Sequence, residues 1–162
     1  MRKLKNFLKA FSLVFLVLLL GGEVSGRIAV NLSPSVRPRL FFLVRRPSVI
    51  GKGNYVIFRP KHMGPYINGK TLVKKVTCDE GDTLTEKGKD YFCERTSPPG
   101  TVYLGRAKDH SLKGERLQNF VYNGVIPKGY CFVEGSNINS YDSRYWGFLR
   151  KSDIEARAYP VF

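Results

Sequence analysis

Histidine is nearly absent from this 162-residue chain, which contains only His62 and His110. A Ser-His-Asp triad needs a histidine between a serine and a carboxylate, and no serine considered below has a histidine near it in sequence. Zinc sites draw mainly on histidine and cysteine, and the three cysteines, Cys78, Cys93 and Cys131, form no C-x-x-C pair. We therefore expect no histidine-based catalysis, no metal and no other cofactor.

Acidic residues are also few. Thirteen Asp and Glu stand against 27 Lys and Arg, so the formal net charge is +14. Residues 1–26 contribute +3 of this charge, which leaves +11 on residues 27–162. A basic body suits nucleic acid or an anionic membrane surface. Because no nucleic-acid-binding motif occurs, we expect membrane lipid rather than nucleic acid as a partner.

One apolar run stands at the start of the chain. A basic segment that ends at Lys9 precedes Ala10–Leu20, which is apolar apart from one serine. With its neighbours the run is about 16 residues long, whereas a full span needs roughly 20, although snorkelling of Lys9 would lengthen it. Val24-Ser25-Gly26 resembles a small-residue cleavage site. Residues 1–26 are therefore either a signal-anchor helix or a cleaved signal peptide, and both place residues 27–162 outside the cytoplasm.

Helix signals are weak after residue 26, and neither repeats nor low-complexity tracts occur. Short apolar or alternating runs separated by Gly and Pro are typical of an all-β fold. The expected strands are Arg27–Leu32, Leu40–Val44, Tyr55–Arg59, Thr71–Val76, Thr101–Leu104 and Tyr130–Glu134. Residues 152–158, SDIEARA, form either one helical turn or a strand. Residues 83–125 are polar and turn-rich, which indicates a loop or flap on one mainly β domain over residues 27–162.

Two adjacent lysines lie in the predicted strand KTLVKKV, residues 70–76. Alternation places Lys74 on the face of Leu72 and Val76, and Lys75 on the opposite face. The simpler interpretation is a solvated face with Lys74 snorkelling at its edge. The other is a buried lysine that acts as a general base, because burial disfavours the charged form. Lowering its pKa from about 10.4 to about 8 would cost roughly 3 kcal/mol.

Two further segments carry candidate polar groups. NLSPSVRPRLFF at residues 31–42 contains Ser33 and Ser35, which beside proline usually serve turn chemistry. Activation of a serine by a lysine is, however, a known variant of the catalytic triad. NSYDSRYWGF at residues 139–148 combines an acid, a base, hydroxyls and aromatic rings. Taken alone, it is an Asx-type turn with surface aromatic side chains.

Together, three segments resemble the boxes of the type I signal peptidases, in order and spacing. SVRP at residues 35–38 resembles S-M-x-P, and KKV at residues 74–76, with Gly81-Asp82, resembles K-R-V-x-G-x-P-G-D. GYCFVEGSNINSYDSRYWG at residues 129–147 resembles G-Y-x-F-V-x-G-D-N-x-x-S-x-D-S-R-Y-W-G. The chain is most similar to the short conjugative-transfer branch, the TraF-type peptidases. The similarity covers most of residues 28–149.

The resemblance implies a signal-peptidase-type β fold and a serine endopeptidase with a Ser-Lys dyad. Ser35 would be the nucleophile and Lys74 the general base. The hydroxyl of Ser33 and the backbone N–H of Ser35 would form the oxyanion hole. Ser140 would hydrogen-bond the lysine amine, and Asp142 and Arg144 would form an ion pair. Tyr145 and Trp146 would pack over this network and limit water.

Some positions depart from the family pattern. The family's G-D-N is Gly135-Ser136-Asn137 here, and its K-R is Lys74-Lys75, so an acid–arginine pair of better-known members is absent. The glycine of the second box is Cys78. In an oxidising compartment, Cys78 and Cys93 would close a loop of about 15 residues, a cross-link of around 3 kcal/mol. Cys131 would remain as a small buried apolar residue.

The similarity to the conjugative branch implies a specific role. The substrate would be a pilin or another precursor of a conjugative transfer or type IV secretion apparatus. A general leader peptidase that releases secreted proteins is the nearer alternative, and a non-catalytic basic component of a secretion channel is the alternative from another class. The expected location is the bacterial inner membrane, with the catalytic domain on the periplasmic side.

Overall fold

The structure is a computed structural model that describes Ser12 and residues 26–60, 63, 66–67 and 69–161. The expected signal-anchor or signal peptide over residues 1–26 lies almost wholly outside this part. Within the described residues, no helix has both the length and the apolar character needed to cross a membrane.

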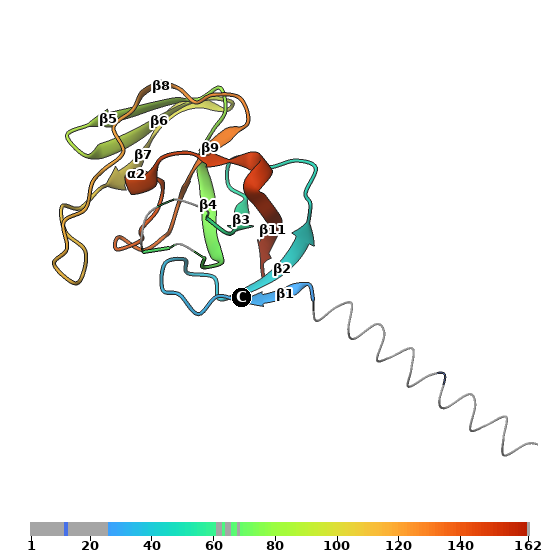
Figure 1. Ribbon diagram of the computed structural model, residues 1–162. Coiled ribbons are helices and arrows are strands. Elements are labelled where there is room, and N and C mark those ends of the chain that lie inside the picture. The colour runs from blue at the N-terminus through green and yellow to red at the C-terminus, as the bar shows by residue number, and fades with distance from the viewer. Residues whose placement is uncertain (1–11, 13–25, 61–62, 64–65, 68, 162) are drawn as a thin grey trace, which may run out of the picture.

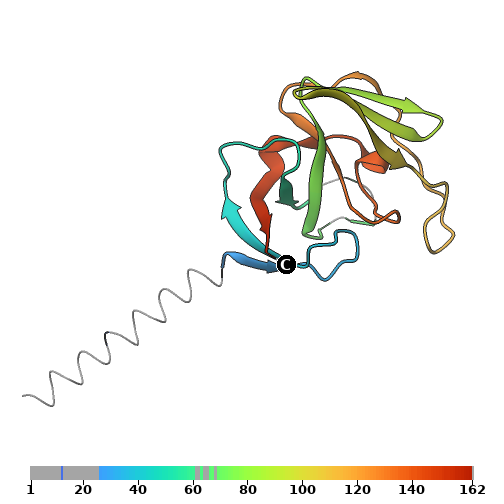
Figure 2. The same ribbon diagram turned by 180° about the vertical axis from the view of Figure 1, so that it is seen from behind.

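The described chain forms two antiparallel sheets (Figures 1 and 2). The larger sheet has the strand order β1-β2-β11-β3-β4-β9-β10. Its strands are β1 (Ile28–Val30), β2 (Leu40–Arg45), β3 (Tyr55–Phe58), β4 (Leu72–Asp79), β9 (Tyr130–Glu134), β10 (Leu149–Arg150) and β11 (Ile154–Pro160). The smaller sheet has the order β7-β6-β5-β8, from β5 (Thr83–Lys87), β6 (Asp90–Thr96), β7 (Pro99–Arg106) and β8 (Asn123–Val125).

The segment SDIEARA, for which the sequence allows either a turn or a strand, contributes to both kinds of structure. A 3-10 helix at Lys151–Asp153 leads into β11. The strand lies between β2 and β3 in the sheet, and Ile154, Ala156 and Ala158 alternate into the core. Pairing on both sides satisfies the backbone groups of β11, a non-local effect that outweighs its mixed local preference.

The polar residues 83–125, expected as a loop or flap, contain the smaller sheet. Few apolar residues form its inner face. Leu84 of β5 pairs with Cys93 of β6, and Tyr91 lies two residues before Cys93 on the same strand. Each of these is fully buried, while most of the alternating neighbours are partly exposed. A disulfide between Cys78 on β4 and Cys93 joins the two sheets. The cross-link and the short alternation together let a segment of polar composition form a sheet.

The core consists of three clusters that meet along the larger sheet. One lies between the smaller sheet and β9, and centres on Tyr91 and Phe132, whose rings stack at 5.6 Å. The other two lie along the larger sheet, around Phe58 in one case and Phe41 in the other. Trp146 packs against the first two clusters and contacts Phe58 at a ring distance of 5.9 Å. The tryptophan therefore connects core clusters rather than covering a surface.

Candidate active site

Lys74 is held on the buried face of β4, opposite Val56 of β3. The side chain is only 2% exposed, and its Nζ donates a hydrogen bond of 2.6 Å to Ser140 Oγ. Lys75 lies on the other face, is exposed, and stands over the Tyr55 ring at 5.8 Å. The alternation of the strand thus separates two chemically identical neighbours into a buried and a solvated lysine.

Burial lowers the pKa of Lys74 to about 8. Removal of the ammonium from water is the main cause, the negative charge of Asp142 opposes it, and the positive charge of Arg144 adds to it. At pH 7 a lysine with a pKa of about 8 is neutral in roughly one molecule in ten, against about one in a few thousand for an unperturbed lysine. Lys74 is therefore able to accept a proton near neutral pH.

Ser35 lies in the loop between β1 and β2, which several hydrogen bonds fasten to the rest of the site. Its carbonyl oxygen accepts from the N–H of Asn137 at 3.2 Å, and the N–H of Arg37 donates to Ser136 Oγ at 2.8 Å. The hydroxyl of Ser33 donates to Ser35 Oγ at 3.0 Å, and the N–H of Ser35 donates to Ser33 Oγ at 3.3 Å. The two groups expected to form the oxyanion hole therefore lie beside Ser35 Oγ and are bonded to each other.

Gly135 lies where the Ser35 loop meets the Ser140 turn. A Cβ atom at this position would stand 2.2 Å from Ser140 Oγ and 2.4 Å from the carbonyl oxygen of Ser35. Carbon atoms do not approach oxygen this closely without displacement, so any larger residue would push the two segments apart. Because Gly135 has no side chain, the Ser140 hydroxyl, which binds Lys74, can lie beside the Ser35 loop.

A buried ionic network supports the Ser140 turn. Asp142 caps the short helix α2 (Ser143–Trp146), and its carboxylate accepts from Nε and Nη2 of Arg144, both at 2.8 Å. This two-pronged geometry is the strongest arrangement for an arginine–carboxylate pair. Asp142 also accepts from the N–H of Gly135 at 3.1 Å, which ties the network to the residue where the Ser140 turn meets the Ser35 loop.

Glu134 is a third member of this network. Its Oε1 lies 3.7 Å from Nε of Arg144 and has no hydrogen-bond partner among the described residues, and the residue is 6% exposed. Burial, together with the nearby charge of Asp142, raises the pKa of Glu134 to about 8, while the charge of Arg144 opposes the rise. Burial therefore favours the protonated carboxyl of Glu134, whereas the carboxylate of Asp142 makes two hydrogen bonds to Arg144.

Ser33, Ser35, Lys74 and Ser140 line one cavity of about 290 Å³, which we call the serine–lysine cavity. These residues come from three separate segments of the sequence, and the fold brings them together. Ser35 and Lys74 do not hydrogen-bond to each other: the amine is bonded to Ser140, and the Ser35 hydroxyl is bonded to Ser33. Catalytic hydrogen bonds are commonly long in substrate-free sites and shorten in the reacting complex.

Some residues of the site had no separate signal in the sequence. Gly135 and Ser136 stood out only as positions of a motif, and the burial of Glu134 depends on Arg144, ten residues further along the chain. Among the described residues, Cys78, Asp82 and Cys93 lie close enough to suggest metal ligands. The two cysteines are joined in the disulfide, so they offer no thiolate to a metal.

Comparison with known proteins identifies the family. Residues 3–162 match the family described as signal peptidase, peptidase S26. The chain belongs to this family. It is 42% identical to signal peptidase I of Aquifex aeolicus (strain VF5) over 65 residues, which are 40% of this chain and 25% of that protein. It is 46% identical to the conjugal transfer protein TraF of Agrobacterium fabrum (strain C58 / ATCC 33970) over 39 residues, 24% of this chain and 22% of that protein.

These matches cover only about a quarter of each relative. Among solved structures, a signal peptidase I from Enterococcus faecalis V583 aligns with a TM-score of 0.42 and 19% identity, over 68% of this chain and 97% of that one. The membership of this chain in the signal peptidase family therefore comes from the match over residues 3–162.

Proposed function

We propose that this signal peptidase relative is a serine endopeptidase that cleaves precursor proteins with Ser35 and Lys74. Neutral Lys74 takes the proton of Ser35, whose Oγ attacks the scissile carbonyl and forms an acyl-enzyme. The same lysine then protonates the leaving amine, and a water molecule that it deprotonates releases the product. In this proposal, the N–H of Ser35 and the hydroxyl of Ser33 give up their present hydrogen bonds and stabilise the oxyanion.

The observation that carries this proposal is the environment of Lys74. A buried lysine without an acidic hydrogen-bond partner destabilises a fold. Lys74 is such a residue, because its Nζ bonds only the Ser140 hydroxyl in the described structure. The amine shares a cavity with Ser35, which is a good arrangement for a base and a poor one for a purely structural cation.

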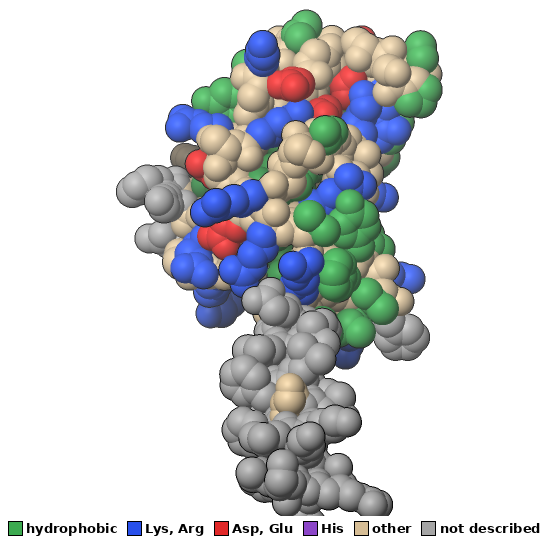
Figure 3. All heavy atoms as spheres, turned by 90° about the vertical axis from the view of Figure 1, so that its right-hand side faces the viewer, with side chains coloured by type: hydrophobic (Ala, Val, Ile, Leu, Met, Phe, Trp, Pro, Cys, Tyr) green, Lys and Arg blue, Asp and Glu red, His purple; other side chains and the backbone are tan. Residues whose placement is uncertain are grey.

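An exposed apolar face supports a location at the membrane. Ile28 on β1, Phe42 on β2 and Tyr159 on β11 are paired neighbours, so they lie on the same side of the sheet. They are 48%, 38% and 41% exposed, and Val30 and Val44 extend the patch along the same strands. Figure 3 shows hydrophobic side chains gathered beside the start of the described chain, with Lys and Arg around them. Such a patch, ringed by cations, suits an anionic bilayer surface.

The natural substrates, in our proposal, are pilins or other precursors of a transfer apparatus. The similarity to the TraF protein and the Ser-x-Ser arrangement of Ser33 and Ser35 support this choice. The longer similarity to a signal peptidase I favours a second candidate, a general leader peptidase that releases secreted proteins. In either case the catalytic domain would act on the periplasmic side of the inner membrane.

Cleavage of two precursors distinguishes these functions. The full chain and its Ser35→Ala variant are each co-expressed with a pilin precursor or a generic secretory precursor, and product masses are measured. We expect the pilin alone to be cut, and only by the unmodified chain. Cutting of both precursors would instead assign a general leader peptidase. Equal cutting by the variant, or no cutting of either precursor, would favour the non-catalytic secretion-channel component.

The rate of cleavage should rise with pH. Only neutral Lys74 can accept the Ser35 proton, and its pKa is about 8. We therefore expect kcat/KM for a precursor peptide to increase about tenfold per pH unit below this value and to level off above it. A pH series from about 6 to about 10 measures the profile on both sides of this pKa. A rate that is flat across this range, or that falls as pH rises, would show that another group is the base.

A further inference from the structure

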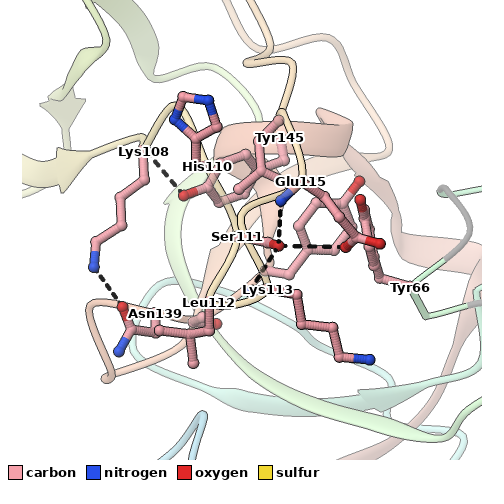
Figure 4. Close-up of a pocket in the computed structure, with 12 residues that line it drawn as sticks. Tyr66, Lys108, His110, Ser111, Leu112, Lys113, Glu115, Asn139 and Tyr145 are labelled. Atoms are coloured by element: carbon pink, nitrogen blue, oxygen red, sulfur yellow. Dashed lines mark hydrogen bonds between the residues drawn. The ribbon is translucent and has the colours of Figure 1, made fainter.

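A second cavity of about 290 Å³ opens beside the serine–lysine cavity, and we call it the side cavity (Figure 4). The loop after β7 supplies Leu112 and Leu117 to its wall, and Tyr145 of α2 closes another side. The two cavities share the lining residues Tyr66, Leu112, Asn139, Ser140 and Tyr141. Ser140, whose hydroxyl holds the amine of Lys74, therefore lies on the boundary between them.

Three tyrosine rings contribute to the lining of the side cavity. The rings of Tyr141 and Tyr145 stack at 5.1 Å, and Tyr66 meets Tyr141 edge-on at the same distance. The Tyr145 hydroxyl accepts the N–H of Lys108 at 3.0 Å, so its polar atom is occupied and its ring faces the cavity. Leu112 is 83% exposed at the wall that both cavities share. An apolar side chain entering here would cover surface that otherwise contacts water.

The transfer of the Ser35 proton through Lys74 indicates which part of a substrate lies near the side cavity. Lys74 must deliver the Ser35 proton to the nitrogen that leaves when the peptide bond breaks, so this nitrogen has to come within hydrogen-bond distance of Nζ. The acyl part of the substrate stays on Ser35. The leaving chain therefore starts beside Nζ and its partner Ser140, and Ser140 also lines the side cavity, so this cavity is within reach of the first residues of the leaving chain.

We infer that the side cavity binds a large apolar or aromatic side chain within the first two residues after the scissile bond. This inference rests on the proposed function, and it assigns a specificity site for the start of the mature product. Successive side chains of an extended chain point in opposite directions, so only one of the two positions faces the cavity. Ring walls favour an aromatic occupant through edge and face contacts.

The charges around the side cavity determine which substrate side chains bind there weakly. Lys108 and Lys113 line the side cavity together with a single acid, Glu115 (Figure 4). A lysine side chain in this position would bring a further cation close to Lys108 and Lys113, and like charges repel. The expected order of preference is phenylalanine, then alanine, then lysine.

Peptides that differ only after the scissile bond test this inference. The full chain in detergent micelles receives precursor peptides with one shared apolar leader ending in Ala-x-Ala, and with Ala, Phe or Lys at the first or the second following position. At one of the two positions we expect kcat/KM for Phe to exceed that for Ala by about tenfold, and Lys to fall below Ala. Equal rates for Ala, Phe and Lys at both positions would overturn the side cavity as a binding site and leave the proposed function intact.

A matched pair of variants locates the preference. Leu112→Glu places an acid on the shared wall, and it should reduce the Phe/Ala ratio toward one and raise the Lys/Ala ratio. Val121→Glu makes a similar change at a residue that is 66% exposed and lines neither cavity, and it should leave both ratios as they are. Equal changes in the two variants would overturn the assignment. Absence of any cleavage by the unmodified chain would overturn the proposed function and this inference together.

Discussion

Replacement of Lys74 by methionine is expected to lower kcat/KM by at least about 10⁴-fold, because in the proposed mechanism it removes the base that deprotonates Ser35. Methionine keeps the length and the apolar stem of the side chain in a site that is 2% exposed, so the packing around β4 should persist. Circular dichroism and a thermal melt would check the fold, and cleavage of a precursor peptide would measure the rate.

Two further variants separate a base from a simple positive charge. Lys74→Arg keeps the charge but cannot be deprotonated at working pH, so it should be as inactive as Lys74→Met. Lys75→Met removes the exposed neighbour on the opposite face of β4 and should retain nearly full activity. A Lys74→Arg enzyme that still cleaved its substrate would rule out proton abstraction by this side chain.

Replacement of Gly135 by alanine is expected to reduce turnover by about 10²-fold or more while the chain still folds, since displacements near 1 Å in an active site have effects of this size. The new Cβ would collide with Ser140 Oγ and with the backbone carbonyl of Ser35, and the carbonyl has little freedom to move. The collision would separate the Ser35 loop from the Ser140 hydroxyl, which accepts the hydrogen bond of Lys74. Overpacking of this kind typically costs about 1–3 kcal/mol of stability, which a thermal melt would register.

Gly51 offers the matched control. A Cβ there would lie 3.7 Å from Asp79 Oδ2, an ordinary contact, and the residue lines neither cavity. Gly51→Ala should therefore change neither the cleavage rate nor the melting temperature appreciably. If Gly135→Ala cleaved as fast as Gly51→Ala, close approach of the two segments would not be required for the reaction.

The parts of the site that are predictable from sequence are those fixed by local rules. Alternation along β4 assigns Lys74 and Lys75 to opposite faces, and in the fold one of them is buried and the other exposed. The motif over residues 129–147 points to Asp142 and Arg144 as an ion pair, and these lie close in sequence as well as in space. Short-range geometry of this kind depends on a few neighbouring residues.

What the sequence does not disclose depends on distant contacts. Polar composition in residues 83–125 suggests a loop because only a few positions, such as Leu84 and Tyr91, turn inward, and Tyr91 packs on Phe132, which lies in another segment. The rings of Trp146 and Phe58 lie 5.9 Å apart, and this contact forms only when β3 meets α2. The requirement for glycine at position 135 likewise arises from two loops that are about a hundred residues apart.

The disulfide gives the folded chain the connectivity of a closed ring with two tails. Lys74 lies on the tail before Cys78, and Ser140 on the tail after Cys93. If another protease cut a peptide bond between the two cysteines, the tails would remain covalently tethered, and the cut would appear on a gel only after reduction. A cut in the loop between β7 and β8 would instead sever the covalent connection between Lys74 and Ser140, whose hydroxyl accepts its hydrogen bond. A cut between β5 and β6 therefore leaves Lys74 and Ser140 covalently connected, whereas a cut between β7 and β8 does not.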